Sequence, residues 1–228
     1  MKPRDVPAVH ALLMEDFQRH PAPVIDLMGA QGESPFRILL ATILSARTKD
    51  ACTAHVVRDK LFPVVHSWDD IRRLSVDELA ALIHPVGFFR QKAAAIKQIP
   101  DVLDERFGGR LPETVEELCE LPGVGRKTAN LVVAVAFGKP AICVDVHVHR
   151  IMNRMGLVKT ETPAETEMAL RETLPVKFWR TWNACFVSLG QRICAPRNPR
   201  CAECPVRAYC EKQSVAELRV LEQGDVEL

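Results

Sequence analysis

Apolar residues recur at helical spacing along most of this 228-residue chain. Residues 88–107 and 165–174 read as amphipathic helices, and residues 141–149, AICVDVHVH, alternate as a strand does. Near the N-terminus, four apolar residues share one helical face: Val9, Leu12, Leu13 and Phe17. Because one strand cannot form a sheet, we predict an all-α fold of about ten short helices.

Helix-capping residues mark several starts in this pattern. Ser34 precedes Pro35, which is the usual order of an N-cap and a first-turn proline. Three further segments have a Thr or Ser with a Glu three residues on, the form of a capping box: Ser75 with Glu78, Thr114 with Glu117, and Thr162 with Glu165.

Composition is that of an ordinary globular chain, with 47% hydrophobic and 26% charged residues and a net charge of +1. No apolar run is long enough to span a bilayer, and the N-terminus lacks the apolar core of a signal peptide. We therefore expect a cytoplasmic protein, bacterial or archaeal, with no membrane partner. In that compartment eight cysteines are more typical of metal ligands or core residues than of disulfides.

Charge is distributed unevenly near the C-terminus. The segment from Lys177 to Lys212 has seven Lys/Arg against two Glu. A basic segment in a neutral chain is compatible with a phosphate-binding face, and equally with an unevenly charged surface.

Four cysteines lie within seventeen residues in a C-x6-C-x2-C-x5-C pattern: Cys194, Cys201, Cys204 and Cys210. Prolines in this segment prevent one long helix, so the thiols can converge. Two metal centres fit, an iron–sulfur cluster or a tetrahedral zinc, and the single C-x2-C pair favours the cluster. The other cysteines lie in apolar surroundings and are interpreted as small core residues: Cys52, Cys119, Cys143 and Cys185.

The segment LPGVGRKTAN, residues 121–130, places Gly123 and Gly125 in front of Arg126 and Lys127. Glycines permit positive φ and close backbone approach, and a helix beginning near Arg126 would direct amides out of the turn. Such a hairpin between two helices can bind a nucleic-acid backbone without reading bases. A tight corner between two helices is the structural alternative.

Lys127 and Asp145 are the candidate reactive pair. Near DNA a lysine contacts phosphate by default, but a desolvated amine can act as a nucleophile and form a Schiff base. Asp145 lies among valines, where a carboxylate needs a partner, and it also fits the N-cap of the next helix, VHVHRIMNRM. His147 and His149 suit phosphate contact or a structural role.

LPGVGRKTAN, VDVHVHRIMNR and the four-cysteine pattern together resemble the endonuclease III family of helix-hairpin-helix DNA glycosylases. The resemblance extends from ILSARTKD to Cys210. It implies two helical domains flanking a DNA groove, with a six-helix domain over residues 27–139 and a cluster domain built from residues 1–26 and 140–228. The four cysteines would hold a [4Fe–4S] cluster.

The same resemblance implies a function. Lys127 matches the nucleophile and Asp145 the catalytic aspartate of a bifunctional DNA glycosylase and abasic-site lyase. That enzyme, expected to be a monomer, would excise oxidised pyrimidines from double-stranded DNA in base excision repair. The residues expected at the DNA are Arg47, Phe88, Leu121, Gly123, Val124, Gly125, Arg126 and His147.

Two alternatives stay open. Arg47 stands where family members often have glutamine, at the position that fills the hole left by a flipped nucleotide, which leaves a monofunctional mismatch glycosylase as one alternative. The other is a non-catalytic DNA-binding module that holds zinc. Phe88 lies where the family inserts an apolar wedge, although it could instead pack in the core beside Phe89.

Overall fold

The computed structural model describes residues 1–211. These residues form twelve α-helices and no β-strand, so the predicted all-α fold is confirmed. Residues 212–228 lie outside the described part, and with them Lys212 and the end of the predicted cluster domain. No helix among residues 1–211 has both the length and the apolar character needed to cross a bilayer.

The chain divides into two compact units. The central unit is Pro23–Ala141, and the terminal unit combines Met1–Ala22 with the chain from Ile142 onward. The sequence-based boundaries were 27 and 139. Eight α-helices occur in the central unit where six were expected, because several are only one or two turns long: α2 (Val24–Ala30), α3 (Pro35–Ser45), α4 (Asp50–Val56), α5 (Trp68–Arg73), α6 (Val76–Ile83), α7 (Phe89–Phe107), α8 (Val115–Leu118) and α9 (Arg126–Ala136).

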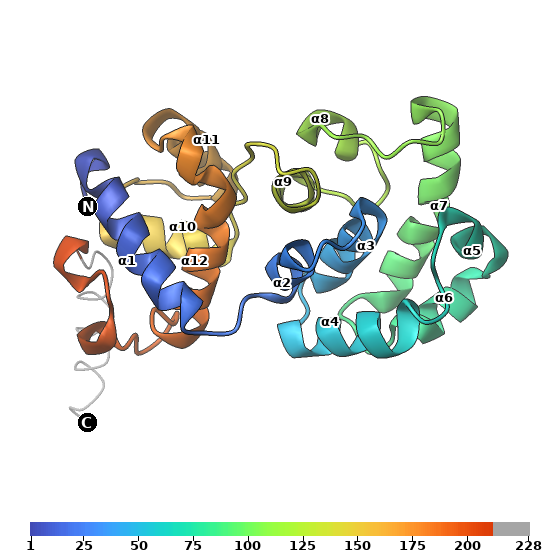
Figure 1. Ribbon diagram of the computed structural model, residues 1–228, viewed down its shortest axis with the longest axis horizontal. Coiled ribbons are helices and arrows are strands. Elements are labelled where there is room, and N and C mark those ends of the chain that lie inside the picture. The colour runs from blue at the N-terminus through green and yellow to red at the C-terminus, as the bar shows by residue number, and fades with distance from the viewer. Residues whose placement is uncertain (212–228) are drawn as a thin grey trace, which may run out of the picture. The chain divides into compact units, whose positions relative to one another are not determined.

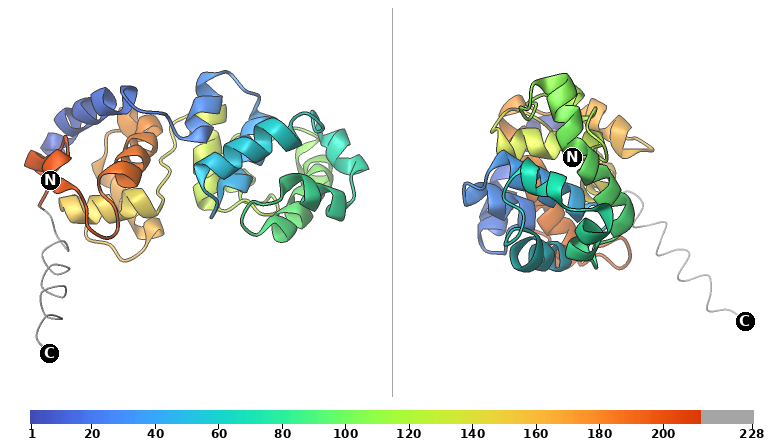
Figure 2. Two further views of the ribbon diagram at one scale, coloured as in Figure 1. Left: turned by 90° about the horizontal axis from the view of Figure 1, so that it is seen from below. Right: turned by 90° about the vertical axis from the view of Figure 1, so that its right-hand side faces the viewer.

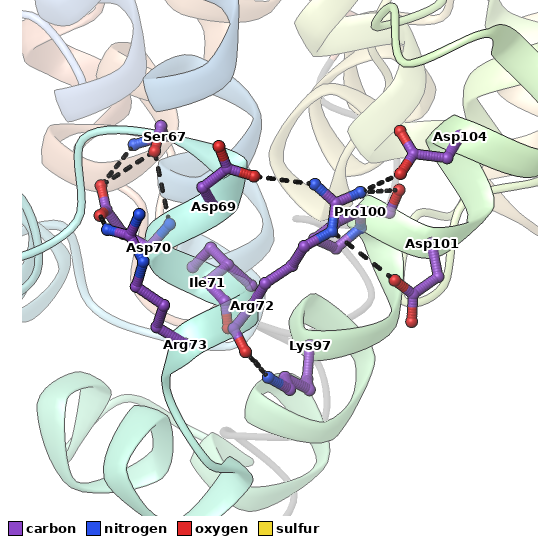
Figure 3. Close-up of polar contacts among 10 residues, drawn as sticks. All are labelled: Ser67, Asp69, Asp70, Ile71, Arg72, Arg73, Lys97, Pro100, Asp101 and Asp104. Atoms are coloured by element: carbon purple, nitrogen blue, oxygen red, sulfur yellow. Dashed lines mark hydrogen bonds and ion pairs between the residues drawn. The ribbon is translucent and has the colours of Figure 1, made fainter.

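The core of the central unit is aliphatic. Helix α3 is buried over seven consecutive residues and packs against α9, while α6 packs along α7 (Figures 1 and 2). Ser34 caps α3 and Ser75 caps α6 with a reciprocal Glu78 contact, as predicted. On the surface of this unit, Arg72 contacts three carboxylates and the Pro100 carbonyl (Figure 3).

The terminal unit is assembled from both ends of the described chain. Its helices are α1 (Val6–Gln18), α10 (Val146–Met155), α11 (Pro163–Thr173) and α12 (Trp179–Arg192). Helices α1 and α10 both pack against α12 (Figure 1), around the buried Trp182 and Phe186. Short 3-10 turns, Cys201–Glu203 and Arg207–Tyr209, follow α12.

The segment that alternates like a strand, residues 141–149, is not one. Ala141–Val144 is buried without regular structure, and Val146 begins α10 because the Asp145 side chain caps that helix. Val144 and Val148 are buried in the core of a helical unit, whereas Val146 between them is exposed.

Candidate functional site

The hairpin between α8 and α9 is built as the glycine pattern predicted, with one difference. Gly123 has φ +76°, and a Cβ there would lie 2.9 Å from the Ala95 Cβ, so this position requires glycine on two counts. Gly125 is extended instead, with φ −94° and ψ 171°, and it is the N-cap of α9. Its missing side chain leaves the first turn of α9 without a side-chain cap.

The side chains around this hairpin divide into a buried and an exposed set. Leu121 and Val124 are 2% and 6% exposed and belong to the core of the central unit, so only their backbone is available to a ligand. Arg126 and Lys127 are exposed on the first turn of α9, where Arg126 approaches Glu116 at 3.9 Å. A helix N-terminus with adjacent cations is suited to anionic oxygens.

The exposure of Lys127 bears on the chemistry considered for it. The sequence left two possibilities for Lys127, a buried amine or a cation at the surface. In the structure the side chain is exposed. Any desolvation of this amine must therefore come from a bound molecule rather than from the protein core.

Asp145 in the terminal unit is a buried carboxylate and the predicted helix cap. The residue is 7% exposed and is the N-cap of α10. Its Oδ1 accepts hydrogen bonds from the His147 amide (2.9 Å) and the Val148 amide (3.0 Å), and its Oδ2 lies 2.9 Å from His147 Nδ1. These donors hold the carboxylate in one orientation.

His147 and His149 differ in environment. His147 is held beside Asp145 by the close approach of α12, since a Cβ on Gly190 would lie 2.8 Å from His147 Cδ2. His149 contacts Thr166 Oγ1 at 2.7 Å within a cluster of hydroxyl and amide groups, which supports the structural role for this histidine.

Arg47 and Phe88 lie together in the central unit. The Arg47 guanidinium is 5.3 Å from the centroid of the Phe88 ring, and both residues have positive φ, 54° and 57°. Phe88 is 53% exposed, so the alternative in which it packs in the core is wrong, whereas Phe89 does pack against the core. The sequence offered no sign that these two side chains meet.

The four-cysteine loop is held to α10 by two arginines. Arg150 Nη2 donates to the Cys194 carbonyl at 2.9 Å. Arg154, 4% exposed, donates to the Cys194 Sγ (3.4 Å) and to the carbonyls of Ala195 and Pro196, both at 2.7 Å. Among the described residues, Arg154 Nε has no acceptor. A buried guanidinium of this kind favours an anionic neighbour.

The four thiols are close enough to influence each other. All are partly buried, and burial, followed by the charges of the three other cysteines, raises the pKa of the Cys204 thiol to about 11. Within residues 1–211, no group of three or more His, Cys, Asp or Glu side chains has the geometry to hold a single metal ion. The thiol donors and the buried cation fit an anionic thiolate-bound metal cluster.

The other cysteines only partly follow the prediction. Cys143 and Cys185 are buried and Cys52 packs against the core, but Cys119 is exposed. It follows the last residue of α8, whose buried side is formed by Val115 and Leu118.

Known proteins define the class to which this site belongs. Residues 40–176 match the model of the HhH-GPD superfamily of base excision DNA repair proteins. Endonuclease III of Thermotoga maritima is 49% identical over 78% of this chain and 83% of its own length. Endonuclease III of Bacillus subtilis is 37% identical over 78% and 82%.

Solved structures agree. A non-covalent endonuclease III–DNA complex matches 97% of this chain and 99% of its own with a TM-score of 0.83 and 29% identity. A trapped endonuclease III–DNA covalent intermediate matches 93% and 97% with a TM-score of 0.82. The chain therefore belongs to the endonuclease III family. It is a DNA glycosylase and abasic-site lyase of base excision repair.

Proposed function

We propose that this enzyme excises oxidised pyrimidines from double-stranded DNA, using Lys127 as nucleophile and Asp145 as its acid–base partner. It acts as a monomer in the cytoplasm. A damaged base inside a duplex is inaccessible to a side chain, so the nucleotide must be extruded, and weakly stacked oxidised pyrimidines require the least energy. The observation that carries the proposal is Lys127 at the first turn of α9, beside a hairpin suited to a phosphate backbone.

Lys127 and Asp145 carry out the chemistry. Lys127 Nζ attacks the deoxyribose C1′ as the C1′–N bond breaks, and that electron pair leaves with the base, which takes up a proton. Asp145 accepts the proton from the attacking amine and stabilises positive charge on the sugar. Cleavage of the C1′–O4′ bond, with O4′ taking up a proton, opens the sugar ring and converts the adduct into a protonated Schiff base. The Schiff base acidifies the C2′ proton, and loss of that proton expels the 3′ phosphate by β-elimination.

Surrounding residues bind the duplex. The hairpin backbone from Leu121 to Gly125 and the Arg126 side chain bind phosphates. His147 orients Asp145 and contacts DNA phosphate. Arg47 and Phe88 enter the base stack, where exposed aromatic and cationic groups replace stacking lost on extrusion. The observation behind this assignment is their exposed, stacked arrangement.

The four-cysteine loop holds a [4Fe–4S] cluster through Cys194, Cys201, Cys204 and Cys210. The buried Arg154 supports an anionic centre at this place. The cluster supplies cross-links that fix a loop without α-helix, and no step of the reaction passes through it.

Borohydride trapping tests the proposal. Duplexes containing thymine glycol or an abasic site should give a covalent protein–DNA adduct, and Lys127→Gln should give none while still binding DNA. Lys139→Gln is the matched control, because Lys139 follows the same helix but pairs with Glu113 at 2.7 Å. If Lys127→Gln gave as much covalent adduct as the wild type, the assignment of Lys127 as nucleophile would be overturned.

The two alternatives that the sequence left open, a monofunctional mismatch glycosylase and a non-catalytic DNA-binding module that holds zinc, conflict with the glycosylase and abasic-site lyase activities of the family.

A further inference from the structure

Arg47 and Phe88 each have a left-handed backbone, which is unfavourable for side chains of this size. Such a conformation persists only where the surrounding structure determines it. Arg47 lies in the loop between α3 and α4, and Phe88 is the N-cap of α7, forty-one positions further along. Some contact must therefore hold both loops in place.

Lys92 provides that contact. Its Nζ donates to the Ala46 carbonyl (2.6 Å) and to Thr48 Oγ1 (3.3 Å), the residues directly before and after Arg47. A third bond reaches the Leu44 carbonyl at 2.8 Å, at the C-terminus of α3, where a cation is favoured. Phe88 lies one turn before Lys92, and the Lys92 amide donates to its carbonyl at 3.0 Å in the ordinary main-chain bond of the first turn of α7. The Lys92 amine thus joins the start of α7, where Phe88 lies, to the Arg47 loop.

The same amine is unsuited to binding DNA itself. An ammonium group has three hydrogens, and three acceptors surround this one. The side chain is half-buried, and that burial lowers the pKa of Lys92 to about 8. Its hydrogen bonds are directed into the protein rather than outward.

Gly87 brings the two loops into backbone contact. Its amide donates to Thr48 Oγ1 at 3.1 Å, so Thr48 accepts from both Gly87 and Lys92. A Cβ at position 87 would lie 2.5 Å from the Arg47 carbonyl oxygen. A contact this short leaves no space for a side chain.

We infer that Lys92 is a positioning residue for damage recognition, which holds the stacked Arg47–Phe88 pair in the geometry that enters the base stack. This inference rests on the proposed function, in which the pair replaces the extruded nucleotide. A preformed pair binds without the entropy loss of ordering two loops. Lys92 therefore sets the preference for damaged over intact duplex rather than the chemical step.

Lys97 is a matched comparison on the same helix. Its Nζ also has three acceptors, here the carbonyls of Ile71 (3.1 Å), Arg72 (2.6 Å) and Leu74 (2.6 Å), at the C-terminal end of α5. Figure 3 shows Lys97 directed at the main chain of Ile71 and Arg72. The two lysines make the same kind of contact, but only Lys92 supports the Arg47 loop.

The experiment compares Lys92→Met with Lys97→Met in the full-length protein. The probe is a duplex with a tetrahydrofuran abasic-site analogue and 2-aminopurine opposite it, which reports unstacking by fluorescence. In Lys92→Met the ratio of affinities for damaged and intact duplex should fall about tenfold, with a smaller fluorescence rise. Lys97→Met should lower thermal stability and keep the wild-type ratio.

Two further variants make the result decisive. Gly87→Ala separates the loops without removing the amine, and it should reproduce the loss of discrimination. Adding Lys92→Met to Arg47→Ala should change the ratio little further, because Lys92 acts through Arg47. Equal effects of Lys92→Met and Lys97→Met, or wild-type ratios in Lys92→Met and Gly87→Ala, would overturn the inference.

Failure of the proposed function gives a different result. Borohydride trapping of the wild type on single-stranded abasic DNA requires no base-pair opening and reports on Lys127 alone. Absence of that adduct would overturn the proposed function. The ratio of affinities for damaged and intact duplex, with the 2-aminopurine fluorescence, would still decide the role of Lys92.

Discussion

The terminal unit buries three charged residues, Asp145, Arg154 and Glu167, whereas the buried polar residues of the central unit are uncharged and its carboxyl group Asp26 is only partly buried. The buried polar residues of the central unit are Thr42, Thr53, Thr128 and Asn130. The central unit is one continuous segment with an aliphatic core that apolar packing alone can stabilise. The terminal unit joins two distant segments and fixes a non-helical cysteine loop by buried polar contacts. The two units should therefore respond differently to loss of polar groups.

The largest expected effect separates catalysis from folding at Asp145. Asparagine caps helices as well as aspartate does, so Asp145→Asn should keep α10 while slowing base excision by about 10²–10⁴-fold. Single-turnover excision from a thymine-glycol duplex measures the rate. As a control, Thr162→Ala removes the cap of α11 and should lower stability by about 1 kcal/mol at an unchanged rate. Wild-type excision by Asp145→Asn would leave Asp145 as a helix cap only.

Loss of a cysteine ligand should affect one unit. Cys204→Ser should lose most bound iron and the brown colour, and hydrogen exchange should rise across the terminal unit while the helices of the central unit stay protected. Cys119→Ser, at an exposed position outside the loop, is the control and should keep wild-type iron. Full iron content in Cys204→Ser would contradict the ligand assignment.

Arg154 and Arg72 allow a buried arginine of the terminal unit to be compared with a surface arginine of the central unit. Arg154→Met removes the buried guanidinium that donates to the carbonyls of Ala195 and Pro196 and should destabilise the protein by about 1–3 kcal/mol. Arg72→Met removes contacts to three carboxylates that are 60–73% exposed (Figure 3), and should cost less than about 1 kcal/mol. Thermal unfolding of both variants measures the difference, and equal losses would contradict it.

The smallest expected effect lies at Asp26 in the central unit. Burial, and then the nearby charge of Asp50, raises the pKa of Asp26 from 3.8 to about 7. The native state thus favours the protonated form, so the stability that this carboxyl contributes is complete below pH 3.8 and is lost as the pH rises through about 7. Asp26→Asn should be more stable than wild type at pH 8.5, by about 2–4 °C in Tm, with a smaller difference at pH 5. A difference independent of pH would contradict the assignment.

The sequence predicted helix starts reliably, because each helix cap is a contact between residues close together in the chain. Ser34, Ser75, Thr114, Thr162 and Asp145 all cap the helices that they were predicted to start. A cap joins a side chain to amides two or three residues away, so sequence spacing contains the whole interaction. Cys119 was misjudged because a four-residue helix does not reveal which side faces the core.

The sequence by itself determined the all-α class, the helix starts, the Gly123 turn before Lys127 and the crowding of four cysteines, since each depends on neighbours along the chain. Only the tertiary structure decided that Lys127 is exposed, that Phe88 stacks on Arg47, and that Lys92 joins their two loops. Those contacts join α7 to the C-terminal end of α3, more than forty residues earlier. No short-range pattern records them, because they form only when the helices between the two loops pack into one core.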